Sequence, residues 1–338
     1  MARILADVGG TCARFAWQEQ SGAALCNLET VECRDYVGPA EAVGDWLRRH
    51  RLGPPEQAAI ALAAPITRDD ALRMTNGLWC FSRRGLAEHL GLRRLAFLND
   101  FTALAIALPA LRADELRQIG GRQISPFCER EPVGVLGPGT GLGVSGLIPG
   151  PQGSWIPLAG EGGHNSLAAH DSETEGIVRI LRGRFGHVSA ERVLSGEGLC
   201  NLWSALRTLE TRADSVPGSR SERCETAPTP EEITELALRD RLPLACKVIE
   251  VFCGMLGHVA GNLALTLGAR GGIFLGGGIL PRWGTQLEDS PLRACFEAKG
   301  RFRSYLEAIP IWVINASDPP ALRGAARFLD SHADVQMK

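Results

Sequence analysis

The sequence lacks a large net charge, paired cysteines and a leading hydrophobic segment. Its 36 basic and 38 acidic residues leave a formal net charge of −2, so no global electrostatic attraction favours nucleic acid or an anionic membrane surface. The 10 cysteines are scattered without a CxxC pair, which argues against both a disulfide framework and a metal cluster. No basic segment followed by a long apolar stretch precedes the first strand. We therefore expect reduced thiols in a cytoplasmic protein.

Two common nucleotide-binding fingerprints are absent or misplaced. No G-x-x-x-x-G-K-[ST] motif occurs, which excludes a P-loop. A G-x-G-x-x-G pattern occurs at Gly141, Gly143 and Gly146, and it would suit a nucleotide-dependent dehydrogenase if a helix followed. Residues 144–148 are predicted to form a strand instead, which disfavours the dehydrogenase.

The length of 338 residues predicts two domains rather than one. Apolar residues make up 45% and charged residues 22% of the chain, which is ordinary for a protein with a sizeable core. Residues 251–268 contain no Asp, Glu, Lys or Arg and approach the length of a membrane span. Because this stretch contains His258, Asn262 and several glycines, we expect a buried core helix.

Two similar strand–turn–strand units lie in different halves of the chain. In the first, strand 4–8 leads through Gly9-Gly10-Thr11 into residues 14–17, which alternate polar and apolar side chains as strands do. The second unit spans residues 133–148, with Gly139-Thr140-Gly141 in the turn. Backbone amides in such turns can approach a phosphate closely because no Cβ intervenes. Each unit is expected to begin one α/β domain. Two such turns, one from each domain, could bind a phosphate chain from opposite sides.

Asp7 ends the first predicted strand beside its glycine turn. Its carboxylate has two interpretations. It accepts a hydrogen bond from the Gly9 or Gly10 amide, a common use of Asp in turns, or it orders, through water, a Mg²⁺ ion carried by nucleotide phosphates.

Asn99 and Asp100 stand between apolar strand 95–98 and an apolar stretch, 101–108, that predicts a buried helix ended by Pro109. One interpretation is that these two residues cap the helix. The other is that an amide and a carboxylate face a polyol, because neighbouring hydroxyls are both donors and acceptors. The two roles are compatible, since a helix N-terminus keeps a carboxylate ionised.

A second polar group follows the second turn, in Gly160-Glu161-Gly162-Gly163-His164. Glycines on both sides of Glu161 indicate a loop shaped to aim its carboxylate; the alternative is an exposed Glu and a structural His. A Glu-x-x-His metal site lacks a third ligand at suitable spacing. Glu191 follows Ser189, a candidate N-cap, so its alternative role is to complement a helix dipole.

Other elements are expected along the chain. They are a strand at 57–64, a helix at 81–90 capped by Ser82, a polar loop at 211–228, a helix opened by a Thr229–Glu232 capping box with Pro230, a strand at 273–275 feeding Gly276–Gly278, a strand at 311–314 and a helix through Phe328.

An ordered set of motifs covers nearly the whole chain. It comprises Asp7–Thr11, "APITRDDALRMTNGLWCFS" (64–82), "LNDFTALA" (98–105), "GPGTGLGVSGLI" (137–148), "LAGEGGHNSLA" (158–168), "GHVSAERVLSG" (186–196) and "GGIFLGGGILPR" (271–282). The set resembles the bacterial glucokinases of the hexokinase, actin and chaperone ATPase superfamily. The Cys-rich zinc motif of the related repressor, open-reading-frame and kinase (ROK) family is absent.

The resemblance implies an α/β fold of two ribonuclease-H-like, actin-like ATPase domains, each with a mixed five-stranded sheet, around a deep cleft. The domains are expected at residues 1–110 plus about 316–338 and at residues 111–315, with the last strand and helix returning to the first domain. It also implies a cytoplasmic enzyme of glycolysis that acts as a homodimer, with glucose and ATP as its small-molecule partners, and neither nucleic acid nor membrane.

The resemblance further implies site residues. Sugar-binding groups are Asn99, Asp100, Glu161, His164 and Glu191; nucleotide-binding groups are Ala6, Asp7, Val8, Gly9, Gly10, Thr11, Gly137, Gly139, Thr140 and Gly141, with Gly277 and Gly278 near adenosine. Asp7 would contact the Mg²⁺ of MgATP through water. Asp100 would be the general base that accepts the proton of the 6-hydroxyl of glucose. Cys12 stands where relatives often have Asn.

The resemblance leaves alternatives open. A kinase for another hexose fits the same residues, since glucose and mannose differ at one carbon that a single contact can distinguish. A non-catalytic sugar sensor on the same fold also fits, although a sensor has no need of a base at Asp100.

Overall fold

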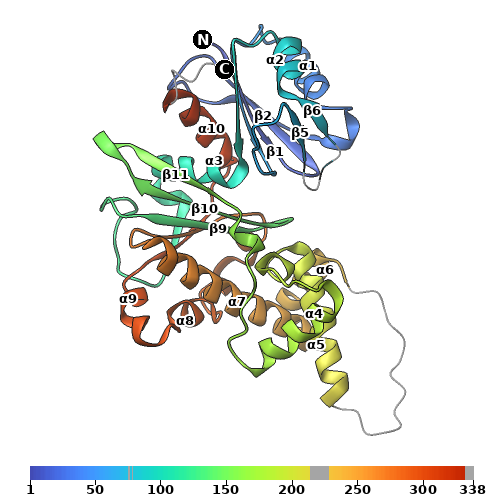
Figure 1. The fold of residues 1–338 in the computed structure, drawn as a ribbon, viewed down its shortest axis with the longest axis vertical. Helices are drawn as coiled ribbons and strands as arrows, with labels where there is room; N and C mark the ends of the chain where they lie inside the picture. Colours follow the sequence, from blue (N-terminus) through green and yellow to red (C-terminus); the bar gives the residue numbers. More distant parts are fainter. Residues whose placement is uncertain (75–76, 78, 214–227, 332–338) are drawn as a thin grey trace. The chain divides into compact units, whose positions relative to one another are not determined.

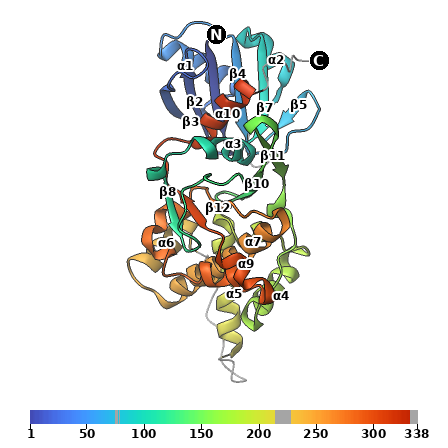
Figure 2. The same ribbon diagram turned by 90° about the vertical axis from the view of Figure 1, so that its left-hand side faces the viewer.

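The computed structural model describes residues 1–74, 77, 79–213 and 228–331, which form mixed α/β structure (Figures 1 and 2). The chain separates into two compact units. Unit 1 comprises residues 1–115, 145–159 and those from 316 onward; unit 2 comprises residues 116–144 and 160–315. The sequence places residues 145–159 in the second domain, whereas in the structure they group with unit 1.

Unit 1 is built on a five-stranded mixed sheet, as expected. Its order is β3-β2-β1-β4-β7; β1 pairs antiparallel with β2 and parallel with β4, and β4 pairs parallel with β7. The bounds are β1 Arg3–Val8, β2 Cys12–Gln18, β3 Cys26–Glu32, β4 Gln57–Leu62, β7 Arg94–Asn99, α1 Pro39–Arg49, α2 Arg83–Leu90, α3 Asp100–Ala107 and α10 Pro320–Ser331, with a separate ribbon of β5 Ala71–Arg73 and β6 Cys80–Ser82.

Alternation of side chains along these strands produces three layers. Ile4 and Ile60 belong to a core shared with α1 and α2, whereas Leu5 belongs to a core shared with α3 and α10. Successive strand residues face opposite sides of a sheet, which explains the division. The α3 and α10 side is lined by small residues such as Ala59 and Ala61, so both helices can lie close to the sheet. In Figure 1, α10 lies beside α3 on this face.

Gly324 sets the packing of α10 on α3. A Cβ at this position would lie 1.8 Å from the backbone oxygen of Ala103, so Gly324→Ala forces the helices apart. Such overpacking typically costs about 1–3 kcal/mol, and we expect the melting temperature to fall. Gly183→Ala is the matched control, because a Cβ at this exposed position in a helix meets nothing within 4 Å and Ala stabilises helices by about 0.5–1 kcal/mol over Gly. Equal melting temperatures for both variants would contradict this packing.

Unit 2 contributes to a sheet of six strands rather than the expected five. Its order is β11-β10-β9-β12-β13-β8, and the extra strand is β8, which pairs antiparallel with β13 at the edge. The prediction that the last strand returns to the first domain is also wrong. β13 pairs parallel with β12 and is buried along its whole length, as an interior strand should be. Only α10 returns. The bounds are β8 Leu116–Ile119, β9 Val133–Pro138, β10 Leu142–Pro149, β11 Trp155–Gly160, β12 Gly272–Leu275 and β13 Ile311–Ile314.

The helices of unit 2 pack around α7. Their bounds are α4 Ser172–Phe185, α5 Gly196–Ala213, α6 Pro230–Leu238, α7 Pro243–Leu267, α8 Leu292–Glu297 and α9 Arg303–Glu307. Among the described residues, α7 is the one helix long and apolar enough to cross a membrane, and 61% of its most apolar window is buried inside the protein. It packs against α5, α6 and α8, which confirms the predicted core helix.

Two predicted caps are confirmed. The Ser82 side chain accepts from the Gly85 amide at the start of α2, and Thr229 and Glu232 form the capping box of α6. Most of the predicted polar loop at 211–228 lies outside the described residues, and residues 211–213 belong to α5.

Candidate active site

The first glycine turn joins two antiparallel strands. β1 and β2 pair with Val8 opposite Ala13, and the Gly9 amide donates to the carbonyl oxygen of Cys12 at 2.9 Å. The chain that leaves the turn is therefore a strand, as its alternating pattern predicts. This geometry leaves the turn exposed at the end of β1, where the Thr11 residue is accessible to solvent.

Asp7 is paired within the hairpin. Arg14 lies directly opposite it in register, and Arg14 Nη1 donates to Asp7 Oδ2 at 3.0 Å. Among the described residues, the hydrogen-bond partner of Asp7 is therefore Arg14 rather than the Gly9 or Gly10 amide of the local interpretation. Burial raises the pKa of the Asp7 carboxyl, and the Arg14 guanidinium opposes that rise. The two residues face each other because Val8 pairs with Ala13, which puts Asp7 opposite Arg14.

Cys12 keeps a polar contact beside the turn. Its Sγ donates to Glu32 Oε1 at 3.4 Å, across the β2–β3 pair. Burial and the Glu32 carboxylate raise the pKa of the Cys12 thiol, so the thiol is protonated at neutral pH and serves as a donor.

Asn99 is the cap of α3. Its Oδ1 accepts from the amides of Phe101 at 3.0 Å and Thr102 at 3.1 Å. Asp100 is the first residue of the helix, and its Oδ1 also accepts from the Phe101 amide, at 2.9 Å. Both side chains are half-buried. The capping interpretation is thus confirmed chiefly for Asn99, which satisfies two of the orphan amides at this terminus.

The turn at Gly9 and the Asn99–Asp100 pair lie at one edge of the unit 1 sheet. Val8 ends β1 opposite Leu62 of β4, and Leu62 lies opposite Asn99 at the end of β7. Two strand spacings separate Val8 from Asn99, which corresponds to about 10 Å. Ligands of open α/β sheets bind outside the carboxyl ends of parallel strands, and this edge is such a place.

The second glycine turn, in unit 2, repeats the first. β9 and β10 are neighbours joined by Gly139-Thr140-Gly141, and the Gly139 amide donates to the carbonyl of Gly141 at 2.8 Å. Because β10 follows this turn, the G-x-G-x-x-G pattern does not open a helix, and the dinucleotide fingerprint is excluded.

Gly277 and Gly278 lie beside this second turn. Gly277 has φ +82°, and a Cβ there would lie 2.2 Å from the carbonyl oxygen of Pro138 at the end of β9. Only glycine allows both the positive φ and this close approach to the Pro138 carbonyl. The segment after β12 is therefore held against the strand that ends at Gly137 and Pro138.

Glu191 connects the second turn to the loop of His164. Its Oε2 accepts from the Leu142 amide at 2.9 Å and lies over Gly141, where a Cβ would stand 2.4 Å from it. Its Oε1 lies 3.9 Å from His164 Nδ1. Glu191 belongs to a single 3₁₀ turn, η6 Ala190–Arg192, and Ser189 makes no side-chain cap there.

The Glu161 loop rests on β10 through its glycines. A Cβ on Gly163 would lie 2.0 Å from the Leu142 carbonyl oxygen, and one on Gly162 would lie 2.9 Å from Val144 Cγ1. This close approach requires glycine at both positions. Glu161 and His164 remain exposed.

The structure brings the expected residues into two groups. In unit 1, Asp7, the Gly9 turn, Asn99 and Asp100 share one sheet edge; in unit 2, the Gly139 turn, Gly277, Glu161, His164 and Glu191 lie together around β10. Sequence reasoning missed a third group, His170, His258 and Cys295.

Comparison with known proteins gives a consistent result. Residues 4–332 match the family described as Glucokinase. A curated glucokinase of Aromatoleum aromaticum is 47% identical over 330 residues, which span 97% of this chain and 95% of the relative. The crystal structure of a glucokinase from an Antarctic psychrotroph has a TM-score of 0.80 at 30% identity and covers 97% of this chain and 99% of its own. A ROK family glucokinase from Streptomyces griseus, solved with glucose and AMPPNP, shares the fold with a TM-score of 0.62 at 19% identity, over 97% and 99% of the two chains.

Proposed function

This chain belongs to the glucokinase family, and on that premise we propose that it transfers the terminal phosphoryl group of ATP to the 6-hydroxyl of glucose. The observation that carries the proposal is the sheet edge of unit 1, where Asp100 and the first glycine turn stand together. A phosphoryl-transfer site needs both a proton acceptor and phosphate-binding amides.

Asp100 is the proposed general base. Asn99 already accepts from two amides at the α3 N-terminus, so the cap does not depend on the Asp100 carboxylate. The helix N-terminus favours its ionised form. Asp100 accepts the proton of the 6-hydroxyl as that oxygen attacks the γ-phosphorus of ATP and ADP leaves in line.

The proposed sugar-binding groups combine acceptors and donors. Glu161 and Glu191 accept hydrogen bonds from sugar hydroxyls, while the His164 imidazole and the Asn99 amide can donate. The Leu142 amide and His164 flank the Glu191 carboxylate on its two oxygens, which fixes its orientation before a sugar arrives. Such preorganisation lowers the cost of binding.

The proposed nucleotide contacts are the two glycine turns, with Gly277 and Gly278 at the adenosine end. Asp7 fits a Mg²⁺ ion held through water, since it supplies a carboxylate oxygen beside the phosphate turn and Mg²⁺ retains several waters. When bound, the ion neutralises charge on the phosphates. Asp7 would hold such an ion through water, and Arg14 Nη1 donates to its Oδ2 in this structure.

We further propose that the two units are the two domains of a sugar kinase, which close over the sugar and exclude water from the phosphates. The enzyme is proposed to act in glycolysis, in the cytoplasm, and as a homodimer.

A coupled assay with MgATP and a panel of glucose, mannose, fructose and N-acetylmannosamine tests the proposal. We expect the highest kcat/KM for glucose and slow ATP hydrolysis without sugar. A tenfold higher kcat/KM for another hexose would assign that hexose instead. Sugar binding without any phosphoryl transfer would indicate the sensor alternative.

A further inference from the structure

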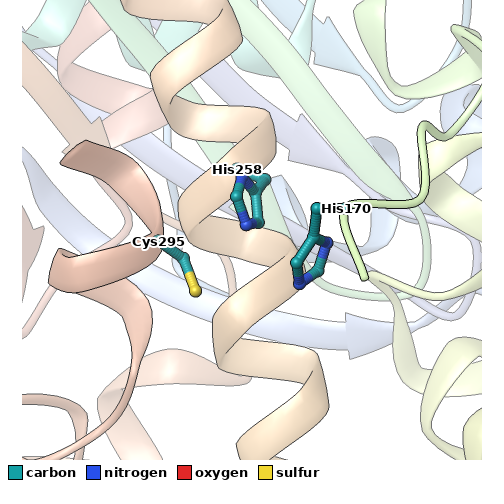
Figure 3. Close-up of side chains that lie close together, drawn as sticks. All are labelled: His170, His258 and Cys295. Carbon is teal, nitrogen blue, oxygen red and sulfur yellow. The ribbon is translucent and has the colours of Figure 1, made fainter. Parts of the chain in front are cut away.

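Three potential metal ligands from separate segments meet in unit 2. His170 precedes α4, His258 lies in α7 and Cys295 lies in α8; their ligand atoms all lie within 4.8 Å of one another. Figure 3 shows the three side chains converging in the space between the two helices and the segment before α4. The two imidazole rings have centroids 3.8 Å apart.

Glycines of α7 place the sulfur of Cys295 there. A Cβ on Gly257 would lie 2.2 Å from the Leu292 carbonyl oxygen and 3.0 Å from Cys295 Cβ, and one on Gly261 would lie 2.7 Å from the Phe296 carbonyl oxygen. Without side chains at these positions, α8 lies directly on α7 beside His258. The glycines therefore fix the distance between the thiol and one imidazole.

The capping box of α4 places His170. The His170 amide donates to Thr174 Oγ1 at 3.0 Å, and the Asp171 side chain accepts from the Thr174 amide at 2.7 Å. Asp171 Oδ2 also lies 3.5 Å from His170 Nε2. A carboxylate behind a histidine is the usual outer support of a metal-binding imidazole, because it orients the ring.

A cavity gives a cation access to the cluster. It has a volume of about 310 Å³ and is lined by both histidines, Asn262 and Lys299, among other residues of unit 2. Lys299 Nζ donates to Asn262 Oδ1 at 2.7 Å and lies 3.5 Å from His258 Nδ1. The cavity has room for a water as a further ligand, whereas the Lys299 ammonium opposes any cation bound beside it.

Burial lowers the pKa of both imidazoles, to about 4 for His258. Asp171, Glu173 and Lys299 are the charged groups that act on the cluster. The Cys295 thiol, whose pKa is raised by burial, must release its proton when it binds a metal.

We propose that His170, His258 and Cys295 form a site for a borderline-soft divalent cation of the Zn²⁺ type, with a water from the cavity as fourth ligand. Two imidazoles and a thiolate match the ligands that Zn²⁺ prefers and not those of Mg²⁺. In a tetrahedral site the ligand atoms lie about 3.3–3.8 Å apart, so small side-chain rotations close the cluster. The site is separate in chemistry from the Mg²⁺ of MgATP.

Titration of the full chain with Co²⁺ tests the site, because Co²⁺ takes the place of Zn²⁺ and reports a thiolate ligand by charge-transfer absorption. We expect one Co²⁺ per chain with that absorption. Cys295→Ser should abolish the absorption, and His258→Asn should weaken binding at least about 10-fold, as loss of even an outer support does. Cys128→Ser, at an exposed cysteine outside the cluster, is the matched control and should change nothing. Lys299→Met should tighten binding by removing the repulsion.

A second measurement tests the site without any substitution, so it does not depend on whether the variants fold. In the unaltered protein, Zn²⁺ should slow alkylation of Cys295 at least about 10-fold, read by mass spectrometry, and should leave alkylation of Cys128 unchanged. If Co²⁺ absorption survives Cys295→Ser, or if Zn²⁺ protects Cys295 and Cys128 equally, the proposed site is wrong. These outcomes are independent of glucose phosphorylation, so they do not depend on the proposed function.

Discussion

Replacing Asp100 by Asn should lower kcat for glucose phosphorylation by about 10²–10⁴, the usual worth of a general base. The affinity for glucose should change little, because an amide still accepts from the Phe101 amide, as Asp100 Oδ1 does, and still pairs with a sugar hydroxyl. The melting temperature should also hold, since Asn99 supplies the principal cap. Initial rates, equilibrium glucose binding and thermal unfolding measure the three quantities.

Two further variants separate catalysis from capping. Asn99→Ala removes the acceptor of two helix amides and should cost about 0.5–2 kcal/mol of stability. Asp240→Asn alters an exposed carboxylate between α6 and α7 and should leave the rate unchanged. Near-normal kcat in Asp100→Asn would remove Asp100 as the base, and an equal loss of stability in Asp100→Asn and Asn99→Ala would assign it to the cap.

Replacing Glu115 by Gln should destabilise the protein by on the order of 3 kcal/mol at pH 7, and this deficit should shrink as the pH falls. Glu115 is 2% exposed, and its carboxylate accepts hydrogen bonds from both terminal nitrogens of Arg323, at 2.8 Å and 2.6 Å. This bidentate pair lowers the pKa of Glu115 from 4.5 to about 2. Because the folded-state pKa is the lower one, the unfolded chain binds the proton more readily. The stabilisation is complete above pH 4.5 and disappears as the pH falls toward 2, at 1.36 kcal/mol per unit.

The difference in free energy of urea unfolding between the unaltered protein and Glu115→Gln, measured from pH 7 to pH 3, checks this dependence. Asp114→Asn is the control. The Asp114 carboxylate, next to Glu115 in the sequence, is 73% exposed, and exposed ion pairs contribute little to stability. A deficit that stays constant across this range would contradict the pairing. Arg323→Met should also destabilise the protein at pH 7, since the buried Glu115 carboxylate loses its bidentate partner and keeps the contacts with Arg112.

Much of the fold follows from local sequence patterns. The alternation after Gly10 predicts β2, and the apolar strand that runs into Asn99 predicts β7 and the start of α3. These features depend on neighbouring residues, so the sequence is sufficient for them. The sixth strand is different, because β8 exists only through pairing with β13, nearly 200 residues later. Such a non-local pairing has no signal in the four residues of β8.

The candidate site likewise has a part that the sequence predicts and a part that depends on non-local packing. The resemblance supplies Glu161, His164 and Glu191, and the structure adds why Glu191 matters locally, through its bond from the Leu142 amide. Nothing in the spacing of His170, His258 and Cys295 indicates that they meet. Their approach depends on the packing of α8 against the glycines of α7, a property of three-dimensional structure.

The return of α10 to unit 1 has a consequence for the order of events during translation. Leu5 of β1 and Leu98 of β7 are buried with Leu322 of α10, which the ribosome adds roughly 200 residues after the other parts of that core. At about 5–20 residues per second, that delay is about 10–40 s. β13, an interior strand of unit 2, also leaves the ribosome only shortly before α10, so neither unit can complete its interior early in synthesis. The apolar surface beside Asp100 that α10 will cover therefore stays open through most of translation.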